Sequence, residues 1–307
     1  MAHSKYSRLL HNIIRKLTLA VHGHILNPLW RPRQARRWKR ESAIERSLLS
    51  YLKIYKKDIE EFIPDNRVET NEKERVFTLW LQGEENAPAI VKACFRSMRR
   101  HLRQELVILD QTNLFDWIDL PDYIIDKWKK GIIGPAHFSD LCRVELLFQH
   151  GGIWLDSTAF VTAPIPKEIE DTDFFVYKSG RKLGGWFAFI QNCFIRAKKG
   201  NQLLAVWRHA MHLYWKYENH ALNYYIHQLL FEFVTIHNKM AYDQFALMPQ
   251  KIQDPTHILW YEHKDDPYDE SRFAEYTSGA FFQKTNYKDK SSYSPEKDTM
   301  AYFLLHS

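Results

Sequence analysis

The sequence predicts an α/β protein with a parallel pair of strands and a helical N-terminal segment. A strand, a helix and a second strand follow one another over residues 75–109, which is the order of a βαβ unit. The 307 residues are 45% hydrophobic and 15% aromatic with only 11 Gly, a composition that excludes disordered and fibrous proteins. No internal repeat or low-complexity linker interrupts the chain, so one large domain is expected after the N-terminal segment.

Hydrophobic periodicity predicts the individual elements in order. A helical stretch at 42–62 precedes a break at 64–66, a buried strand at 75–81 ends near Gly83, and Pro88 opens a helix. That helix has an apolar stripe at Val91, Phe95, Met98 and Leu102. Further helices are expected at 121–130, 138–149, 201–216 and 220–238. Further strands are expected at 105–109, 153–155, 173–178, 186–196, 256–262 and 279–283.

The first 40 residues differ from the rest of the chain in charge. They contain ten Lys or Arg and no acidic residue, which leaves 33 basic and 37 acidic residues, a net charge of −4, in the remainder. One helical face among these charges is apolar, at Leu10, Ile13, Ile14, Leu17 and Val21. An amphipathic basic helix is therefore expected, either attached to an anionic membrane surface or packed on its own domain.

The same segment sets the expected domain boundary. Its apolar run is too often broken by charge for a membrane-spanning helix or a secretory signal. We expect a basic helical segment at 1–66 and the main domain at 67–307. The three cysteines, Cys94, Cys142 and Cys193, are odd in number and lack metal-ligand spacing, so we expect them to be reduced thiols in the core. Reduced thiols favour a cytoplasmic location.

One helix, turn and strand unit has the residues with the most chemical meaning. Ser139 is expected to cap a helix with Asp140 in its first turn, and Asp140 and Arg143 are i, i+3 neighbours. After a double glycine, a short strand ends at Asp156. Polar groups at the carboxyl end of a strand lie on the ligand side of an open α/β sheet, where carboxylates and an arginine can bind sugar hydroxyls. Spacing alone leaves a second interpretation, a helix cap with an ordinary Asp–Arg surface pair.

The pattern Ser139-Asp140-x-x-Arg143, followed by Gly151-Gly152-Ile153-Trp154-Leu155-Asp156, resembles glycosyltransferase family 32 and its bacterial capsular polysaccharide synthesis branch. The resemblance runs in collinear order over roughly residues 75–288, so it is more specific than one short motif. The first forty residues lie outside it. Its other motifs lie at 79–88, 107–110, 121–124, 131–140, 197–201 and 282–288.

The resemblance implies a GT-A-type, Rossmann-like fold and a donor site for a nucleotide sugar. Trp80 matches the aromatic residue that stacks on the nucleotide base, and Gln82 lies in the same motif. Asp140 and Arg143 match the pair that holds the donor sugar. Two further residues are expected near the donor, Asp156 as the first carboxylate of an Asp-x-Asp motif and Asn192 in a later strand.

The implied reaction is transfer of a hexose from UDP-glucose or UDP-galactose with retention of anomeric configuration. The acceptor attacks on the face that the diphosphate leaves, and the leaving phosphate helps to accept the acceptor proton. The branch implies a lipid-linked oligosaccharide acceptor in capsule or exopolysaccharide synthesis, at the inner face of the bacterial cell membrane. The basic N-terminal helix fits a peripheral protein at that location.

Thr158 departs from the Asp-x-Asp pattern, because it stands where the second carboxylate is expected. Leaving diphosphate must still be neutralised. Either Mg²⁺ or Mn²⁺ is held by Asp156 and the donor phosphates, or basic side chains replace the metal. Lys284 and Lys288 are the candidates for the second arrangement.

Two other classes of function remain open from the residues alone. Asp140 and Asp156 could act as the carboxylate pair of a glycoside hydrolase. The basic end could instead belong to a membrane-bound scaffold or a nucleic-acid binder centred on residues 31–40. The acidic remainder of the chain argues against a large phosphate-binding surface, so no nucleic-acid partner is expected.

Overall fold

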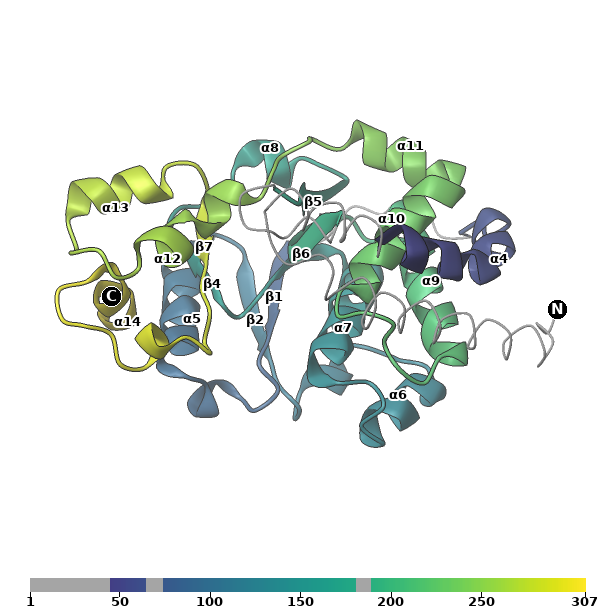
Figure 1. The fold of residues 1–307 in the computed structure, drawn as a ribbon, viewed down its shortest axis with the longest axis horizontal. Helices are drawn as coiled ribbons and strands as arrows, with labels where there is room; N and C mark the ends of the chain where they lie inside the picture. Colours follow the sequence, from purple (N-terminus) through teal and green to yellow (C-terminus); the bar gives the residue numbers. More distant parts are fainter. Residues whose placement is uncertain (1–44, 65–73, 181–188) are drawn as a thin grey trace, which may run out of the picture.

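A five-stranded mixed sheet in the order β2-β1-β3-β6-β5 lies at the centre of the molecule (Figure 1). The computed structural model describes residues 45–64, 74–180 and 189–307. The strands of this sheet are β1 Arg75–Leu79, β2 Glu105–Leu109, β3 Gly152–Leu155, β5 Phe174–Lys178 and β6 Ile190–Ala197. An α/β architecture with a parallel pair is therefore confirmed, whereas the narrower GT-A assignment stays a prediction.

The directions of the strands follow from their connections. β1 is parallel to both β2 and β3, and α5 (Ala89–His101) crosses from β1 to β2 as the predicted βαβ unit requires. β6 is antiparallel to β3 and β5. The carboxyl ends of β1, β2 and β3 consequently meet at one edge of the sheet.

Gly152 permits the close approach of β1 and β3. Its φ of 100° is left-handed, and a Cβ built on it would lie 2.6 Å from the backbone oxygen of Arg75. Only glycine fits there. The double glycine thus serves strand packing as well as the turn that the sequence predicts.

Helices cover the sheet in two groups (Figure 1). One group contains α7 (Pro135–His150), which packs on α9 (Gln202–Tyr217), and α9 in turn contacts α10 (Ile226–His237) and α11 (Lys239–Leu247). In the other, α5 contacts a two-stranded antiparallel sheet of β4 (Ala159–Val161) and β7 (Phe282–Lys284). The remaining helices are α4 Lys56–Glu60, α6 Asp122–Lys129, α8 Lys167–Glu170, α12 Ile258–His263, α13 Glu270–Thr277 and α14 Met300–His306.

The helical residues 45–60 share the hydrophobic core with the main domain. Leu48, Leu52 and Ile59 are buried in the same cluster as the residues of α9 and α10. Tyr51 and Tyr55 donate hydrogen bonds of 2.5 and 2.9 Å to Glu218 Oε1, just beyond α9. This part of the predicted N-terminal segment therefore packs on the domain. The basic helix expected within residues 1–40 lies outside the described residues, and the boundary at 66 stays a prediction.

Two predicted strands are wrong in type or position. Residues 256–262 are helical, because Pro255 favours the first turn of a short 3-10 helix, Asp254–His257, that leads into α12. The backbone N–H of Leu259 then donates to Gln283 Oε1 at 3.1 Å, a tertiary contact that local β-propensity does not anticipate. The strand expected at 279–283 forms later, at Phe282–Lys284.

Other helix boundaries also shift. The helix expected from residue 220 begins at Ile226, and periodicity missed β4, α8, α11, α13 and α14. The three cysteines are buried and free, as predicted. Burial raises the pKa of the Cys94 thiol to about 12, which makes it unreactive. Within the part of the chain that the structure describes, no helix has the length and apolar character needed to cross a membrane.

Candidate functional site

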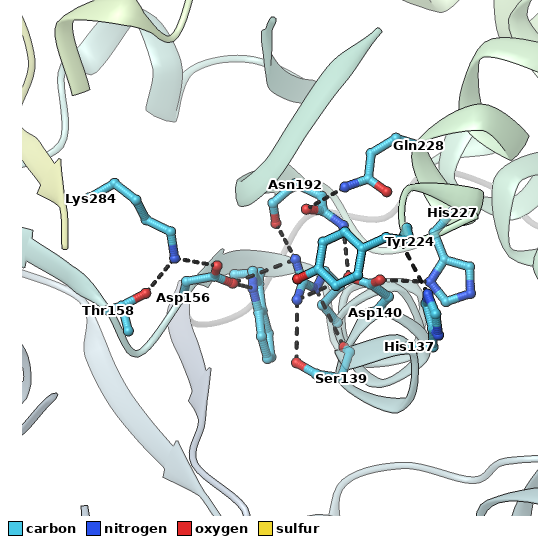
Figure 2. A network of polar contacts seen from close by, with 12 residues as sticks. His137, Ser139, Asp140, Asp156, Thr158, Asn192, Tyr224, His227, Gln228 and Lys284 are labelled. Atoms are coloured by element: carbon cyan, nitrogen blue, oxygen red, sulfur yellow. Dashed lines mark hydrogen bonds and ion pairs between the residues drawn. The ribbon is translucent and has the colours of Figure 1, made fainter. Parts of the chain in front are cut away.

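Asp156 follows β3 directly, at the carboxyl edge of the sheet, where neighbouring groups hold both its backbone and its side chain (Figure 2). Its backbone N–H donates to the Cys193 oxygen on β6 at 2.8 Å. The buried Trp154 indole donates to Asp156 Oδ1 at 2.9 Å. The carboxylate therefore has a fixed orientation before any ligand binds.

Asp140 and Arg143 lie on the face of α7 that meets this edge. Arg143 Nη2 is 3.1 Å from Asp140 Oδ1, and Arg143 Nη1 is 3.5 Å from Asp156 Oδ1. Only 8% of Asp140 and 6% of Arg143 is exposed, so the alternative of a surface pair is wrong. The predicted cap at Ser139 is also wrong, because α7 begins at Pro135, a residue that favours the first helical position.

Arg143 uses its whole guanidinium group within the protein. Nε donates to the Ser139 oxygen at 3.4 Å and Nη2 to Ser139 Oγ at 3.3 Å, while Nη1 donates to the Asn192 oxygen at 2.6 Å. The guanidinium also lies over the Trp154 ring, 4.9 Å from its centroid. Together with its ion pairs to the two carboxylates, these three hydrogen bonds hold the Arg143 guanidinium in place.

Asp140 is also bound by residues of β6 and α10. Asn192 Nδ2 donates to Asp140 Oδ1 at 2.8 Å, and Gln228 Nε2 donates to Asn192 Oδ1 at 3.1 Å. His227 Nδ1 lies 2.9 Å from Asp140 Oδ2. Because the Trp215 indole donates to His227 Nε2 at 2.9 Å, the proton of a neutral His227 is on Nδ1 and faces Asp140. Burial lowers the pKa of His227, which keeps the ring neutral.

His227, Gln228 and Tyr224 are site residues that the sequence analysis missed. The only local signal is a His-Gln pair in the first turn of a largely apolar helix, which says nothing about its partner. Tyr224 is 66% exposed, and its backbone oxygen accepts a hydrogen bond from His137 Nε2 at 3.1 Å (Figure 2). Partial burial and the Asp140 and Asp156 charges raise the pKa of Tyr224.

Lys284 reaches the site from the small sheet. β7 pairs with β4 in a register that places Lys284 opposite Ala159. Its Nζ is 2.8 Å from Asp156 Oδ2 and also contacts Thr158 Oγ1 (Figure 2). Burial alone would lower the pKa of Lys284, but Asp156, together with the weaker effects of Cys193 and Tyr261, raises it. The lysine is therefore an ammonium ion.

The segment after Lys284 leads to the predicted base-stacking residue. Trp80 follows β1, and its ring meets Tyr287 edge to face at 5.1 Å. Lys288 is exposed, with its Nζ 5.5 Å from the Tyr287 ring. Gln82 is exposed as well, and its backbone oxygen accepts from Asn86 Nδ2 at 2.8 Å. The structure thus brings Asp140, Arg143, Asp156, Asn192 and Lys284 together, while Gln82 and Lys288 lie outside this polar network.

Both carboxyl groups of the network are ionised at neutral pH. Burial would raise the pKa of Asp140, but Arg143 and His227 lower it to about 2. Burial would also raise the pKa of Asp156, but Lys284 and Arg143 hold it below the usual range. Two carboxylates and two cations leave the cluster neutral.

The residues at positions 156 and 158 do not fit a divalent cation. Among the described residues, no group of three His, Cys, Asp or Glu side chains could hold a metal. The oxygens of Asp156 and Thr158 both face the Lys284 ammonium. A divalent ion about 4 Å from that ammonium would be repelled by about 8 kcal/mol at the effective dielectric near a protein surface. The contacts favour the other arrangement that the sequence left open, neutralisation by basic side chains.

Comparisons with known proteins agree with the sequence motifs. The model of the family described as capsular polysaccharide synthesis protein matches residues 30–304. The glycosyltransferase afumC of Aspergillus fumigatus is 27% identical over 112 residues, which cover 34% of this chain and 29% of that protein. The O-glycosyltransferase braB of Annulohypoxylon truncatum is 25% identical over 176 residues, which cover 50% of this chain and 41% of that protein. The chain thus spans less than half the length of these curated relatives.

A solved structure, the PaToxG glycosyltransferase, matches 68% of this chain and 84% of its own, with 12% identity and a TM-score of 0.37. That likeness is too low to carry an argument. The family match is different in kind, because it spans most of the chain and includes every residue of the polar network. The capsular branch of the predicted resemblance is therefore confirmed, and the chain belongs to the family of capsular polysaccharide synthesis proteins.

Proposed function

We propose that this protein is a glycosyltransferase that moves a hexose from a nucleotide diphosphate sugar, UDP-glucose or UDP-galactose, to an acceptor hydroxyl. One observation carries the proposal: the buried Asp140–Arg143–Asp156 network lies at the carboxyl ends of the strands, where open α/β sheets bind ligands. The family membership and the glycosyltransferase relatives support it.

The proposed donor site divides its tasks among these residues. Asp140 accepts hydrogen bonds from sugar hydroxyls at the edge that its protein partners leave free. Arg143 is a positioning residue, because protein atoms hold its guanidinium group and it forms ion pairs with both carboxylates. Trp80 offers its ring to the nucleotide base from the end of the neighbouring strand. Gln82, Asn192 and Lys288 stay predicted contacts of the donor.

Transfer with retention requires no enzyme nucleophile in this scheme. The bond between sugar C1 and the β-phosphate oxygen breaks, and its electron pair stays on the phosphate. The acceptor oxygen forms the new bond to C1 on the same face, through an oxocarbenium-like state. The acceptor proton passes to the leaving phosphate oxygen, so charges and atoms balance.

The carboxylate pair is poorly suited to the competing hydrolase chemistry. A glycosidase needs one carboxyl group with a raised pKa to protonate the leaving oxygen. Here the pKa values of Asp140 and Asp156 are both lowered. Neither residue holds a proton to donate at neutral pH, so transfer remains the better reading of the site.

A product assay tests the proposal. The purified chain is incubated with UDP-glucose or UDP-galactose, and nuclear magnetic resonance follows UDP and the first-formed sugar anomer, with water or an added sugar as acceptor. We expect retention of configuration and loss of turnover in Asp156→Asn. Asp116→Asn is the matched control, because it removes an exposed carboxylate far along the chain from the network. Inversion of the anomer, or full turnover in Asp156→Asn, would contradict the scheme.

The setting of the reaction is a further part of the proposal. The acceptor is a lipid-linked oligosaccharide of a capsule or exopolysaccharide, and the protein is peripheral on the inner face of the cell membrane. Anionic lipid attracts basic segments, and residues 1–40 supply ten positive charges. Sedimentation with phosphatidylglycerol vesicles should fall when residues 1–40 are removed. Equal vesicle binding by the shortened chain would contradict the membrane part alone.

A further inference from the structure

The Lys284 ammonium lies between the two positions of the altered Asp-x-Asp motif. Its Nζ is 2.8 Å from Asp156 Oδ2 and in contact with Thr158 Oγ1. These are the side chains of the first and third residues of that motif. A positive charge of this protein thus lies where two carboxylates would face a metal ion.

The backbone fixes this lysine in place. Lys284 pairs with Ala159 in the antiparallel register of β7 and β4. The next residue, Thr285, donates to the Thr158 backbone oxygen from its N–H at 2.7 Å and from Oγ1 at 2.9 Å. The chain segments that carry the ammonium and the hydroxyl are therefore joined directly, and Lys284 is not a mobile surface lysine.

Lys284 also keeps one donor that has no acceptor among the described residues. An ammonium group has three N–H donors, and within the described residues two of them have acceptors, Asp156 and Thr158. Arg143 already makes three hydrogen bonds and two ion pairs within the protein. The side chain of Lys284 is 18% exposed, against 7% for Arg143. Lys284 is thus the cation of the cluster that can add an external anionic ligand.

We propose that the Lys284 ammonium replaces a divalent metal ion, binding the donor diphosphate and neutralising the leaving nucleoside diphosphate. The inference rests on the proposed glycosyltransferase function and names the side chain that stabilises the leaving group of that reaction. When the C1–O bond breaks, the electron pair remains on the β-phosphate oxygen, and the third N–H of Lys284 donates to that phosphate. The lysine keeps its proton, and the acceptor proton goes to the phosphate as before.

Thr158 fits this arrangement better than a second carboxylate would. Its hydroxyl accepts from the ammonium without adding negative charge. The pair of Asp156 and Lys284 is then neutral, so a diphosphate entering the site meets no surplus carboxylate. A second Asp at position 158 would repel the phosphates unless a divalent ion compensated it.

Calorimetry on the full-length protein tests the inference. UDP, GDP and dTDP are titrated with EDTA and, separately, with Mn²⁺, and the matching nucleosides serve as reference ligands. We expect at least one diphosphate to bind equally well in EDTA and in Mn²⁺. Lys284→Met should weaken the binding of that diphosphate about 10- to 100-fold, which corresponds to the loss of a charge-assisted hydrogen bond, and should leave the affinity for the nucleoside unchanged.

Two variants separate charge from structure. Lys284→Arg keeps the positive charge and should recover most of the diphosphate affinity. Lys290→Met is the matched control, because it removes an exposed lysine of the same segment, and it should bind like the wild type. Equal weakening of nucleoside and diphosphate by Lys284→Met would assign the lysine a structural role and overturn the inference.

The titrations of the wild type in EDTA and in Mn²⁺ need no variant, and they test the role of Lys284 separately from the proposed function. Diphosphate binding by the wild type that appears only with Mn²⁺ would overturn the role of Lys284 and leave the glycosyltransferase proposal standing. Binding of no diphosphate under either condition, with the fold confirmed by circular dichroism, would overturn the proposed function itself.

Discussion

Helix α7 carries two buried acid–base clusters that differ in what surrounds them. On one face, Glu145 is completely buried and binds Arg208 Nε at 2.8 and 2.9 Å and His212 Nε2 at 3.1 Å. Gln149 adds a hydrogen bond of 2.7 Å. All these partners belong to α7 and α9, so the cluster joins two helices.

The Asp140 cluster on the other face uses the same residue types in a different place. Its partners come from α7, the end of β3, β6, α10 and β7. Asp156 and Lys284 at its edge remain partly exposed. Burial, an arginine and a histidine therefore do not distinguish a site from a structural cluster. What distinguishes the Asp140 cluster as a site is its position at the strand ends and, among the described residues, the donor of Lys284 that has no acceptor.

The largest expected difference between the clusters is in activity. Asp140→Asn should lower kcat/KM about 10³-fold, about 4 kcal/mol, because a preorganised charge at the donor sugar is lost. The measurement is the product assay with UDP-glucose or UDP-galactose. Stability falls as well, since Arg143 loses a buried partner. Near wild-type activity would place Asp140 with Glu145 as a structural residue.

Glu145→Gln is the matched change on the structural face, since it too removes one charge and no volume. We expect the free energy of unfolding, measured in urea, to fall by about 2–3 kcal/mol, because Arg208 and His212 lose a buried ionised partner. Its kcat/KM should stay close to that of the wild type. A loss of activity with unchanged stability would show that the cluster between α7 and α9 also serves the reaction.

Trp80 tests how far the site extends along the strand ends. Replacement by Ala should weaken nucleotide binding by about 1–3 kcal/mol, the range for base stacking on an aromatic ring. Titration with UDP and with uridine should show the same loss, because the base is common to both. Unchanged affinity would make Trp80 only a packing partner of Tyr287.

A third cluster sharpens the comparison, because it brings together two acids, Glu45 and Glu232. Burial first, and then the neighbouring Glu45, raise the pKa of Glu232 to about 8. Since the folded state binds this proton more tightly than an unfolded chain with a pKa near 4.5, the stabilising effect is present below that value and is lost as pH rises towards 8. Glu232→Gln should therefore raise stability by about 1–2 kcal/mol above pH 8. Urea unfolding at acidic and alkaline pH measures the free energy of unfolding of the variant and the wild type. A gain in stability at acidic pH only would contradict the raised pKa of Glu232.

Local sequence determined the first half of the fold and the centre of the site. The apolar runs at 75–81 and 105–109 with the helix between them allowed only a βαβ unit. The i, i+3 spacing put Asp140 and Arg143 on one helical face, and the double glycine led into the strand before Asp156. These features depend on residues close together in the chain, so periodicity and backbone preference are enough to predict them.

Tertiary structure decided the rest. The sequence offered Lys284 and Lys288 as equal candidates, and only the pairing of β7 with β4 places Lys284 against Asp156 and leaves Lys288 exposed. His227 reaches Asp140 because α10 and α7 both pack on β6, and residues 258–263 become a helix through the contact of Leu259 with Gln283. Strand register and long-range ion pairs join residues far apart in the chain, and local periodicity contains no information about which distant segment will be the partner.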